Sequence, residues 1–435
     1  MTASRLQLSS AVSRLGTESA FEVVNRVVAL EKQGQSIVKL HIGAPDFRTP
    51  EFIVEAGRKA LADGFHGYTP AKGLPQVREV VADYCKRFHK GDVHPDQVMI
   101  VPGGKPTMFY AMLLFGEPGA EIVYPNPGFP IYESAIKWTG ATPVPLELKE
   151  ERGFAFSADE LLSKITPRTR LIIVNSPANP TGGVTRKGEL DKLVAGLEKH
   201  PHVAIMSDEI YSRLLYDGEE HASILSYPSI ADRAILLDGW SKTYAMTGWR
   251  MGFGVWPKQL VDHAERIQIN CNSCTNAAAQ IAGMEALRGP QECVDAMRRA
   301  FEARRKVIVE ELNRIPGFRC AMPKGAFYAF PNTSGTGIAS RELERKLLAE
   351  AKVSCLSGTS FGAMGEGYLR FSYANSEEQI KEGMPMLELA LWKAKMNSEV
   401  NDDSIPSMEF RNKCRFNCYA DIVIPNVLPF LSPKL

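Results

Sequence analysis

The sequence lacks any apolar run that approaches the ~18–20 residues of a membrane-spanning helix. Its N-terminus also lacks the apolar core of a secretory signal. The charges nearly balance, at a formal net charge of +1, so no electrostatic force draws the chain toward nucleic acid or an anionic membrane. These absences predict a cytoplasmic protein with neither a membrane nor a nucleic-acid partner. The C-terminal Pro-Lys-Leu is a distant variant of the Ser-Lys-Leu peroxisomal address, which leaves the peroxisome as an alternative compartment.

Two familiar kinds of binding site are also missing from the sequence. No strand-like run is followed by Gly-x-Gly-x-x-Gly, which argues against a nicotinamide-dependent dehydrogenase. Cysteines occur in two close pairs, Cys271 with Cys274 and Cys414 with Cys418. A zinc site would require these pairs to meet across a wide gap with no nearby histidine, so no metal is predicted. We interpret the cysteines as reduced thiols in a cytosol-like compartment.

Short apolar runs alternate with polar loops and helical stretches through the first two thirds of the chain. These runs lie at 98–101, 121–124, 171–174, 203–206 and 234–237. Strands that are apolar on both faces and alternate with helices predict an α/β fold, with a mostly parallel central sheet covered by helices on both faces. Ligands of such sheets bind beyond the carboxyl ends of the strands.

The pattern changes after Cys271 to long helices over 276–315, broken at Gly289-Pro290. Short strands are predicted near 318–320, 327–330, 353–355 and 368–373, which indicates a smaller α+β domain. At 435 residues the chain is too long for one compact core. The predicted division is an N-terminal arm with part of the small domain (1–49), a large cofactor-binding domain (50–288), a small C-terminal domain (289–397) and an irregular tail outside the fold (398–435).

The most informative stretch follows the apolar run at 234–237. That run leads through Asp238 and Gly239 to Lys242, and Arg250 comes eight residues later. A strand end that presents a lysine, with an arginine close behind, suits a small anionic ligand that also needs a covalent attachment point.

The segment Ser-Lys-Thr-Tyr-Ala-Met-Thr-Gly-Trp-Arg, residues 241–250, resembles the cofactor-lysine motif of the class I/II aminotransferases. These are fold-type I enzymes that use pyridoxal phosphate (PLP), and the general similarity is to their aspartate/aromatic branch. Further family motifs extend the resemblance over roughly residues 15–395. It implies a fold-type I architecture, a PLP cofactor bonded covalently to Lys242, and a homodimer with shared active sites.

The resemblance implies the phosphate-binding residues of this cofactor. Gly103-Gly104-Lys105, at a strand-to-helix turn, would supply N–H donors at a helix N-terminus. Arg250 would supply a bidentate charge. Gly239 stands where many relatives carry a phosphate-binding serine, and Ser241 is the residue that would compensate. Tyr68, in Gly-Tyr-Thr-Pro, resembles the tyrosine that reaches the phosphate of the neighbouring subunit.

The cofactor ring implies a second set of residues. Asp208, in Asp-Glu-Ile-Tyr, would keep the pyridine nitrogen protonated, because a nearby carboxylate stabilises the cationic form. Tyr211 and Asn179 would bond the phenolic oxygen, and Phe129 would stack on the ring. The catalytic residues implied are Lys242, Asp208 and Tyr211.

The substrate needs a partner for its α-carboxylate. Arg370, in Tyr-Leu-Arg-Phe-Ser-Tyr-Ala, matches the family arginine with this role, and Gly43 and Asn179 complete the implied substrate site. No second arginine plainly recognises a side-chain carboxylate, so the sequence leaves the amino acid open.

The predicted activity is transfer of an amino group from an L-amino acid to a 2-oxo acid by a ping-pong mechanism, in which Lys242 acts as general base and then acid. A C–S β-lyase or a cyclising synthase would need the same lysine, aspartate and arginines. These two activities therefore remain alternatives at this point.

Overall fold

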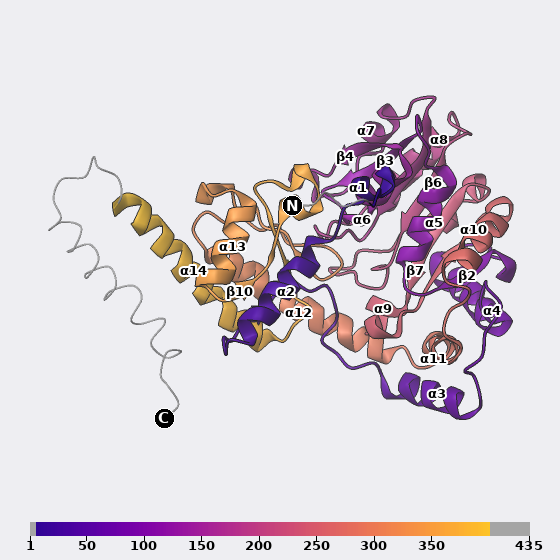
Figure 1. Ribbon diagram of the computed structural model, residues 1–435, viewed down its shortest axis with the longest axis horizontal. Coiled ribbons are helices and arrows are strands. Elements are labelled where there is room, and N and C mark those ends of the chain that lie inside the picture. The colour runs from indigo at the N-terminus through magenta and orange to yellow at the C-terminus, as the bar shows by residue number, and fades with distance from the viewer. Residues whose placement is uncertain (1–5, 401–435) are drawn as a thin grey trace.

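The computed structural model describes residues 6–400 and is built from two domains (Figure 1). The larger contains a seven-stranded sheet of order β2-β8-β7-β6-β5-β3-β4. Strand β8 is antiparallel to both neighbours, whereas β7, β6, β5, β3 and β4 pair in parallel. The strands are β2 (Val98–Val101), β3 (Glu121–Asn126), β4 (Thr142–Glu147), β5 (Thr169–Asn175), β6 (Ala204–Asp208), β7 (Ala234–Gly239) and β8 (Gly252–Val255).

Alternation along each strand explains why both faces of this sheet are covered. In β5, Leu171 and Ile173 point to one helical layer, and Ile172 and Val174 to the other. The first layer contains α5 (Lys105–Phe115), α6 (Ile131–Thr139) and α10 (Lys258–Cys271). The second contains α7 (Ala158–Ser163) and α8 (Lys187–Leu197), and farther along the sheet α4 (Pro75–Tyr84) and α11 (Ala277–Arg288), against which α3 (Glu51–Ala62) packs.

The parallel register brings the carboxyl ends of the central strands together. Asn175 at the end of β5 is paired with Asp208 at the end of β6, and Asp208 with Leu237 in β7. The polar loops that follow these strands therefore meet at one edge of the sheet, where the site residues were predicted.

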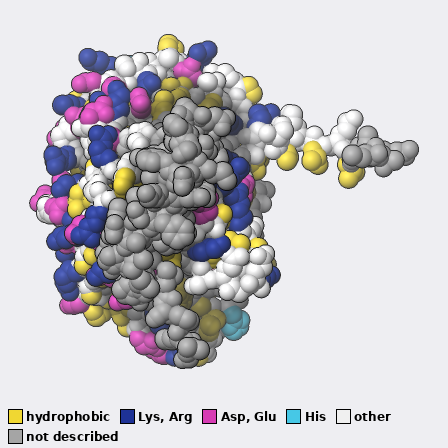
Figure 2. All heavy atoms as spheres, turned by 90° about the vertical axis from the view of Figure 1, so that its left-hand side faces the viewer, with side chains coloured by type: hydrophobic (Ala, Val, Ile, Leu, Met, Phe, Trp, Pro, Cys, Tyr) yellow, Lys and Arg dark blue, Asp and Glu magenta, His cyan; other side chains and the backbone are white. Residues whose placement is uncertain are grey.

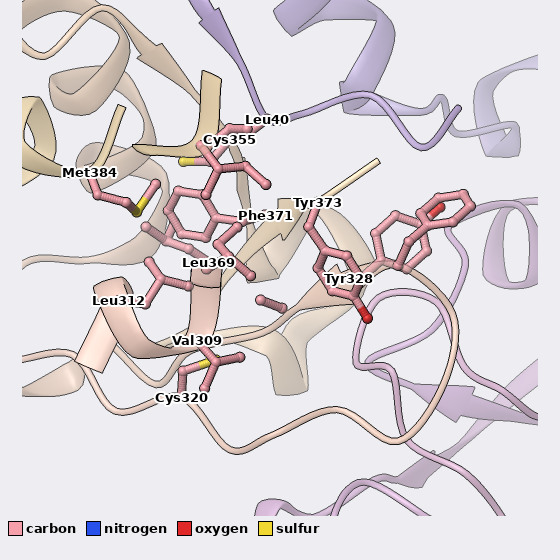
Figure 3. Close-up of a cluster of buried hydrophobic side chains, with 14 of the residues drawn as sticks. Leu40, Val309, Leu312, Cys320, Tyr328, Cys355, Leu369, Phe371, Tyr373 and Met384 are labelled. Carbon is pink, nitrogen blue, oxygen red and sulfur yellow. The ribbon is translucent and has the colours of Figure 1, made fainter. Parts of the chain in front are cut away.

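The smaller domain encloses its own apolar core, shown in Figure 3. Met297, Phe301, Ile308 and Leu312 recur at helical spacing on the buried face of α12 (Glu292–Arg314). They face an antiparallel sheet of order β11-β12-β9. The remaining elements are β1 (Val38–Lys39), β9 (Tyr328–Ala329), β10 (Val353–Ser354), β11 (Leu356–Ser357), β12 (Leu369–Ser372), α13 (Ser340–Glu350) and α14 (Glu377–Val400).

The N-terminal segment belongs spatially to the smaller domain. Strand β1 pairs in parallel with β10, and Val23 and Val27 of α2 (Ser19–Glu31) pack against that domain in a small cluster. A short helix, α1 (Ser10–Arg14), precedes α2 and contacts α6. The predicted tail begins within the last turn of α14, and 401–435 lie outside the described residues.

The predicted α/β class is confirmed, and the break at Gly289-Pro290 separates α11 from α12 as expected. The strand expected at 318–320 is wrong. Gly317 adopts a left-handed conformation (φ 85°) that turns the chain, and Arg319 then makes a single bridge to Asn332.

Within residues 6–400, no helix is both long and apolar enough to cross a membrane. On the face shown in Figure 2, basic and acidic side chains are interspersed over the described surface.

Candidate active site

Lys242 lies in α9 (Trp240–Thr243), the single turn that follows β7 at the carboxyl edge of the sheet. Its Nζ donates a hydrogen bond to the carbonyl oxygen of Gly43 and lies 5.8 Å from the ring centroid of Phe327. Burial, followed by the positive charges of Arg370 and Arg250, lowers the pKa of Lys242 to about 8. A substantial fraction of the amine is therefore neutral near physiological pH, as a nucleophile or general base requires.

Asp208, the last residue of β6, is buried in the floor of the site. Its Oδ2 accepts a hydrogen bond of 2.6 Å from the hydroxyl of Tyr132, and its Oδ1 accepts one of 3.3 Å from the N–H of Ile210. Burial raises the pKa of this carboxyl group to about 6, despite both hydrogen bonds. A cation placed against Asp208 would therefore be strongly favoured.

Arg370 reaches the site from β12 of the smaller domain. Its Nη1 donates to Oδ1 of Asn179 at 3.0 Å and its Nη2 to the carbonyl oxygen of His41 at 2.6 Å. Its guanidinium lies 4.5 Å from the ring centroid of Tyr328 and 4.7 Å from that of Phe361. Among the described residues, its Nε is buried without a hydrogen-bond partner. A buried donor without a partner is costly, so an anionic ligand would relieve this arrangement.

Tyr211 and Gly43 both lie at the hydroxyl group of Tyr328. The hydroxyl groups of Tyr211 and Tyr328 lie 2.7 Å apart. A Cβ at Gly43 would lie 2.2 Å from the hydroxyl oxygen of Tyr328, so only glycine fits here. The structure thus brings Lys242, Gly43 and Arg370 together with Tyr211 and Asn179.

A second corner of the site combines a helix N-terminus with an arginine. Gly103 has φ 85°, and Gly104 caps α5. A Cβ at Gly103 would lie 2.0 Å from Nη2 of Arg250, so the glycine allows the guanidinium to approach the backbone. Arg250 donates to the carbonyl oxygen of Thr247 at 2.9 Å and remains exposed. The N–H groups of a helix N-terminus beside an exposed guanidinium suit a phosphate.

Four predicted site residues lie differently from the rest. Ser241 is buried at the start of α9. Phe129 packs edge-on against Tyr132, with ring centroids 5.9 Å apart. The side chain of Lys105 forms an ion pair with Glu18. Tyr68 lies outside the arrangement, with its side chain 95% exposed.

Sequence reasoning missed Tyr132, Tyr328 and Glu18. Tyr132 lies in the first turn of α6 and Tyr328 lies in β9, and neither stands in a pattern that distinguishes it from a core aromatic. Glu18 immediately precedes α2 and had no visible signal beyond its position.

A buried network of charged residues lies behind Asp208. His89 Nδ1 is 3.0 Å from Oε2 of Glu209, and its Nε2 is 2.9 Å from Oδ2 of Asp238. His221 Nε2 lies 2.6 Å from the same Glu209 oxygen. Burial opposes the charge on His89, but its bonds to Asp238 and Glu209 raise the pKa of this histidine to about 9. The network ties the end of β6 to the end of β7.

The three ligand atoms of His89, Glu209 and His221 lie within 4.8 Å of one another, which is close enough for a metal. The separations from the Glu209 oxygen are hydrogen-bond lengths, and both His89 nitrogens already face carboxylates. We therefore interpret the cluster as an imidazolium held between two carboxylates.

Replacing His89 with glutamine should lower the free energy of unfolding by about 3 kcal/mol at pH 6, because two buried carboxylates lose their cation. The folded pKa of about 9 exceeds the ordinary 6.5. The stabilisation is therefore complete below pH 6.5 and disappears as the pH rises through 9. Urea denaturation at pH 6 and pH 9.5 should show the smaller loss at the higher pH. The exposed His202 provides the matched glutamine control; equal losses at both pH values would contradict a charged His89.

The site fits PLP in three respects. A phosphate would meet the α5 N-terminus and Arg250, and the Gly103 backbone leaves room for it. A protonated pyridine nitrogen would satisfy the buried Asp208. The neutral fraction of Lys242 could bond to an aldehyde.

Comparison with known proteins agrees with this site. Residues 35–386 match the family model for aminotransferase class I and II. The chain is 40% identical over 359 residues to an aspartate aminotransferase of Pyrococcus horikoshii, covering 82% of this chain and 91% of that protein. It is 37% identical over 376 residues to aromatic-amino-acid aminotransferase 2 of Thermococcus litoralis, covering 86% and 96%.

Solved structures extend the similarity to the fold. The aspartate aminotransferase of Thermus thermophilus with maleate superposes with a TM-score of 0.84 at 32% identity, covering 88% of this chain and 100% of that one. Among the activities that the motifs alone left open, the relatives thus support amino transfer. The chain belongs to the class I and II aminotransferases and is a PLP-dependent enzyme of that family.

Proposed function

We propose that the enzyme moves an amino group from an L-amino acid to a 2-oxo acid in two half-reactions, with ping-pong kinetics. One observation carries this proposal: Lys242 and Arg370 converge on the backbone at His41–Gly43. Lys242 donates to the carbonyl oxygen of Gly43, and Arg370 donates to that of His41. An amino acid whose α-carboxylate bonds Arg370 would therefore present its Cα to the lysine.

PLP supplies, when bound, an aldehyde that accepts the amino group and a ring that withdraws electrons from the substrate Cα. In our proposal Lys242 Nζ removes the Cα proton and later returns a proton, since its lowered pKa suits both roles near neutrality. Asp208 keeps the ring nitrogen protonated. Arg370, held by Asn179 and by the rings of Tyr328 and Phe361, orients the Cα–H bond.

The test is to mix the PLP-loaded enzyme with single amino acids and follow the absorbance of the bound cofactor. An amino donor should change the spectrum stoichiometrically without an oxo acid present, and a 2-oxo acid should then reverse the change. Release of ammonia or of a thiol, with no oxo acid formed from the donor, would overturn amino transfer.

We further propose that the active enzyme is a homodimer, because the phosphate corner is open in one subunit. Arg250 lines a groove of about 740 Å³ together with Trp249 and Asn276. Tyr68, which the resemblance assigns to the partner's phosphate site, is fully available at 95% exposure. The Tyr68 of one subunit would close the groove of the other.

Mixing two inactive variants, Tyr68→Ala and Lys242→Ala, should restore up to about a quarter of wild-type turnover after subunit exchange. Half of the dimers are then mixed, and each mixed dimer has one intact site. The experiment requires that Tyr68→Ala alone remove most of the turnover. An active enzyme that sediments as a monomer would contradict shared sites. So would a lack of recovered turnover when labelled subunits show that the two variants have exchanged.

Finally, we propose that the enzyme works in the cytoplasm. The six cysteines among the described residues are free thiols, and Cys85, Cys320 and Cys355 are buried, as expected of a reducing compartment. Fluorescent fusions at either terminus would separate this location from the peroxisome.

A further inference from the structure

The carboxylate of Glu18 lies beside the site, and none of the roles in binding the cofactor requires it. It forms an ion pair with Nζ of Lys105, and the side chain of Glu18 is the more buried partner, at 13% exposure against 41%. Burial and the nearby arginines lower the pKa of Lys242, and the negative charge of Glu18 opposes that shift. The same negative charge also favours the protonated forms of Arg370 and Tyr328. Glu18 is thus an electrostatic neighbour of the reacting groups.

The ion pair lies among aromatic rings. Nζ of Lys105 is 5.7 Å from the ring centroid of Phe21 and 5.6 Å from that of Phe129. Phe129 in turn contacts Tyr132, whose hydroxyl group bonds Asp208. One wall of the site therefore consists of phenyl rings and a cation that already has its counter-ion.

A groove of about 820 Å³ opens beside this wall, at Phe129. Residues 13–17, which lead directly into Glu18, form one side, and Phe129 and Phe361 form part of the other. Phe361 packs on the guanidinium of Arg370. Glu18 and Lys105 do not line the groove itself, but Phe129 lines it and lies against Lys105. A substrate side chain that extends from Arg370 past Phe361 toward Phe129 would therefore come near the Glu18–Lys105 pair.

We propose that Glu18 determines the charge class of the substrate side chain, so that the enzyme prefers amino acids with uncharged apolar or aromatic side chains over aspartate and glutamate. Without Glu18, Lys105 would be an unpaired cation suited to a side-chain carboxylate. With Glu18, a second substrate carboxylate must compete with an anion already in place and is repelled by it. The inference rests on the proposed amino transfer, because it concerns the substrate of that same site.

The test compares two unreactive ligands on the cofactor-loaded enzyme by titration calorimetry: succinate, a dicarboxylate, and 3-phenylpropionate, an aromatic monocarboxylate. Glu18→Gln should tighten succinate binding by about tenfold, because a negative charge near a partly exposed ligand is removed. Binding of 3-phenylpropionate should change by less than about twofold. The ratio of kcat/KM for aspartate to that for phenylalanine should rise in parallel.

Glu22→Gln is the matched control, since Glu22 lies one turn farther along α2 with a half-exposed side chain near Arg26. Equal effects of Glu18→Gln on both ligands, or no effect on either, would overturn the proposal. Wild-type enzyme that binds succinate more tightly than 3-phenylpropionate would also overturn it, even if the variant failed to fold. Absence of turnover with every amino acid would instead count against the proposed function, and the calorimetric comparison would still decide the role of Glu18.

Discussion

Replacing Lys242 with alanine should reduce turnover by at least about 10⁴-fold, because one change removes both the covalent attachment and the proton carrier. The variant should still bind PLP, since Arg250 and the α5 N-terminus remain in place. Borohydride reduction of the loaded wild-type enzyme, followed by peptide mapping, should locate the cofactor on Lys242. Spectroscopy of the variant should show PLP bound without that attachment.

The matched control is Lys72→Ala, which removes a lysine that pairs with Asp262 and Glu265 at 3.8 and 3.5 Å. Its turnover should stay within about threefold of wild type, because surface ion pairs contribute little. A cofactor attached by borohydride reduction to Lys72 or Lys105 instead, or substantial turnover by Lys242→Ala, would refute the assignment of Lys242.

The carboxyl edge of the sheet was predictable because parallel strands end together. Asn175, Asp208 and Gly239 close neighbouring strands, so any polar residues just beyond them must meet. Arg370 could not be placed in this way. It comes from the smaller domain and bonds Asn179 across 191 positions of the chain, and only the family resemblance connected the two.

The contacts that distinguish this chain depend on packing rather than on local pattern. Tyr132 bonds Asp208 from 76 positions away, and Glu18 pairs with Lys105 from 87 positions away. Periodicity predicts that α6 has a buried face but not which carboxylate that face meets. His89 is similar: the regular helix α4 ends at Tyr84, and a π-helical turn, Cys85–His89, carries the imidazole to Glu209 and Asp238.

Burial sets the electrostatics of the site. An amine that bonds to an aldehyde requires a lowered pKa, and burial together with two arginines lowers that of Lys242. The raised pKa of Asp208 was not expected. It arises because β6 delivers the carboxyl group to a buried position where its hydrogen-bond donors, Tyr132 and the N–H of Ile210, are neutral.

Because Asp208 is buried, water cannot replace its carboxylate beside the ring nitrogen, and its substitution should have a large effect on turnover. Asp208→Asn should lower turnover by at least about 10³-fold, because the carboxylate that holds the ring nitrogen protonated is removed from a buried site. Asp208→Glu should retain more activity, since it keeps the charge. Stopped-flow measurement of the cofactor spectrum with a single amino donor would assign the loss to the proton-transfer step.

The same substitution should stabilise the cofactor-free protein. The folded pKa of about 6 lies above the ordinary 3.8, so the folded state binds more protons than the unfolded state, and Asp208 costs stability as the pH rises through that window. At pH 7, Asp208→Asn should therefore raise the free energy of unfolding of the cofactor-free protein by about 1–2 kcal/mol. At pH 3.5 the gain should nearly vanish, because the wild-type group is then mostly protonated in both states. Tyr132→Phe, which removes a hydrogen bond and leaves the charge, provides the control and should destabilise. A merely structural aspartate would instead give an asparagine variant that is less stable at pH 7, and that result, or near-normal turnover, would exclude the proposed role.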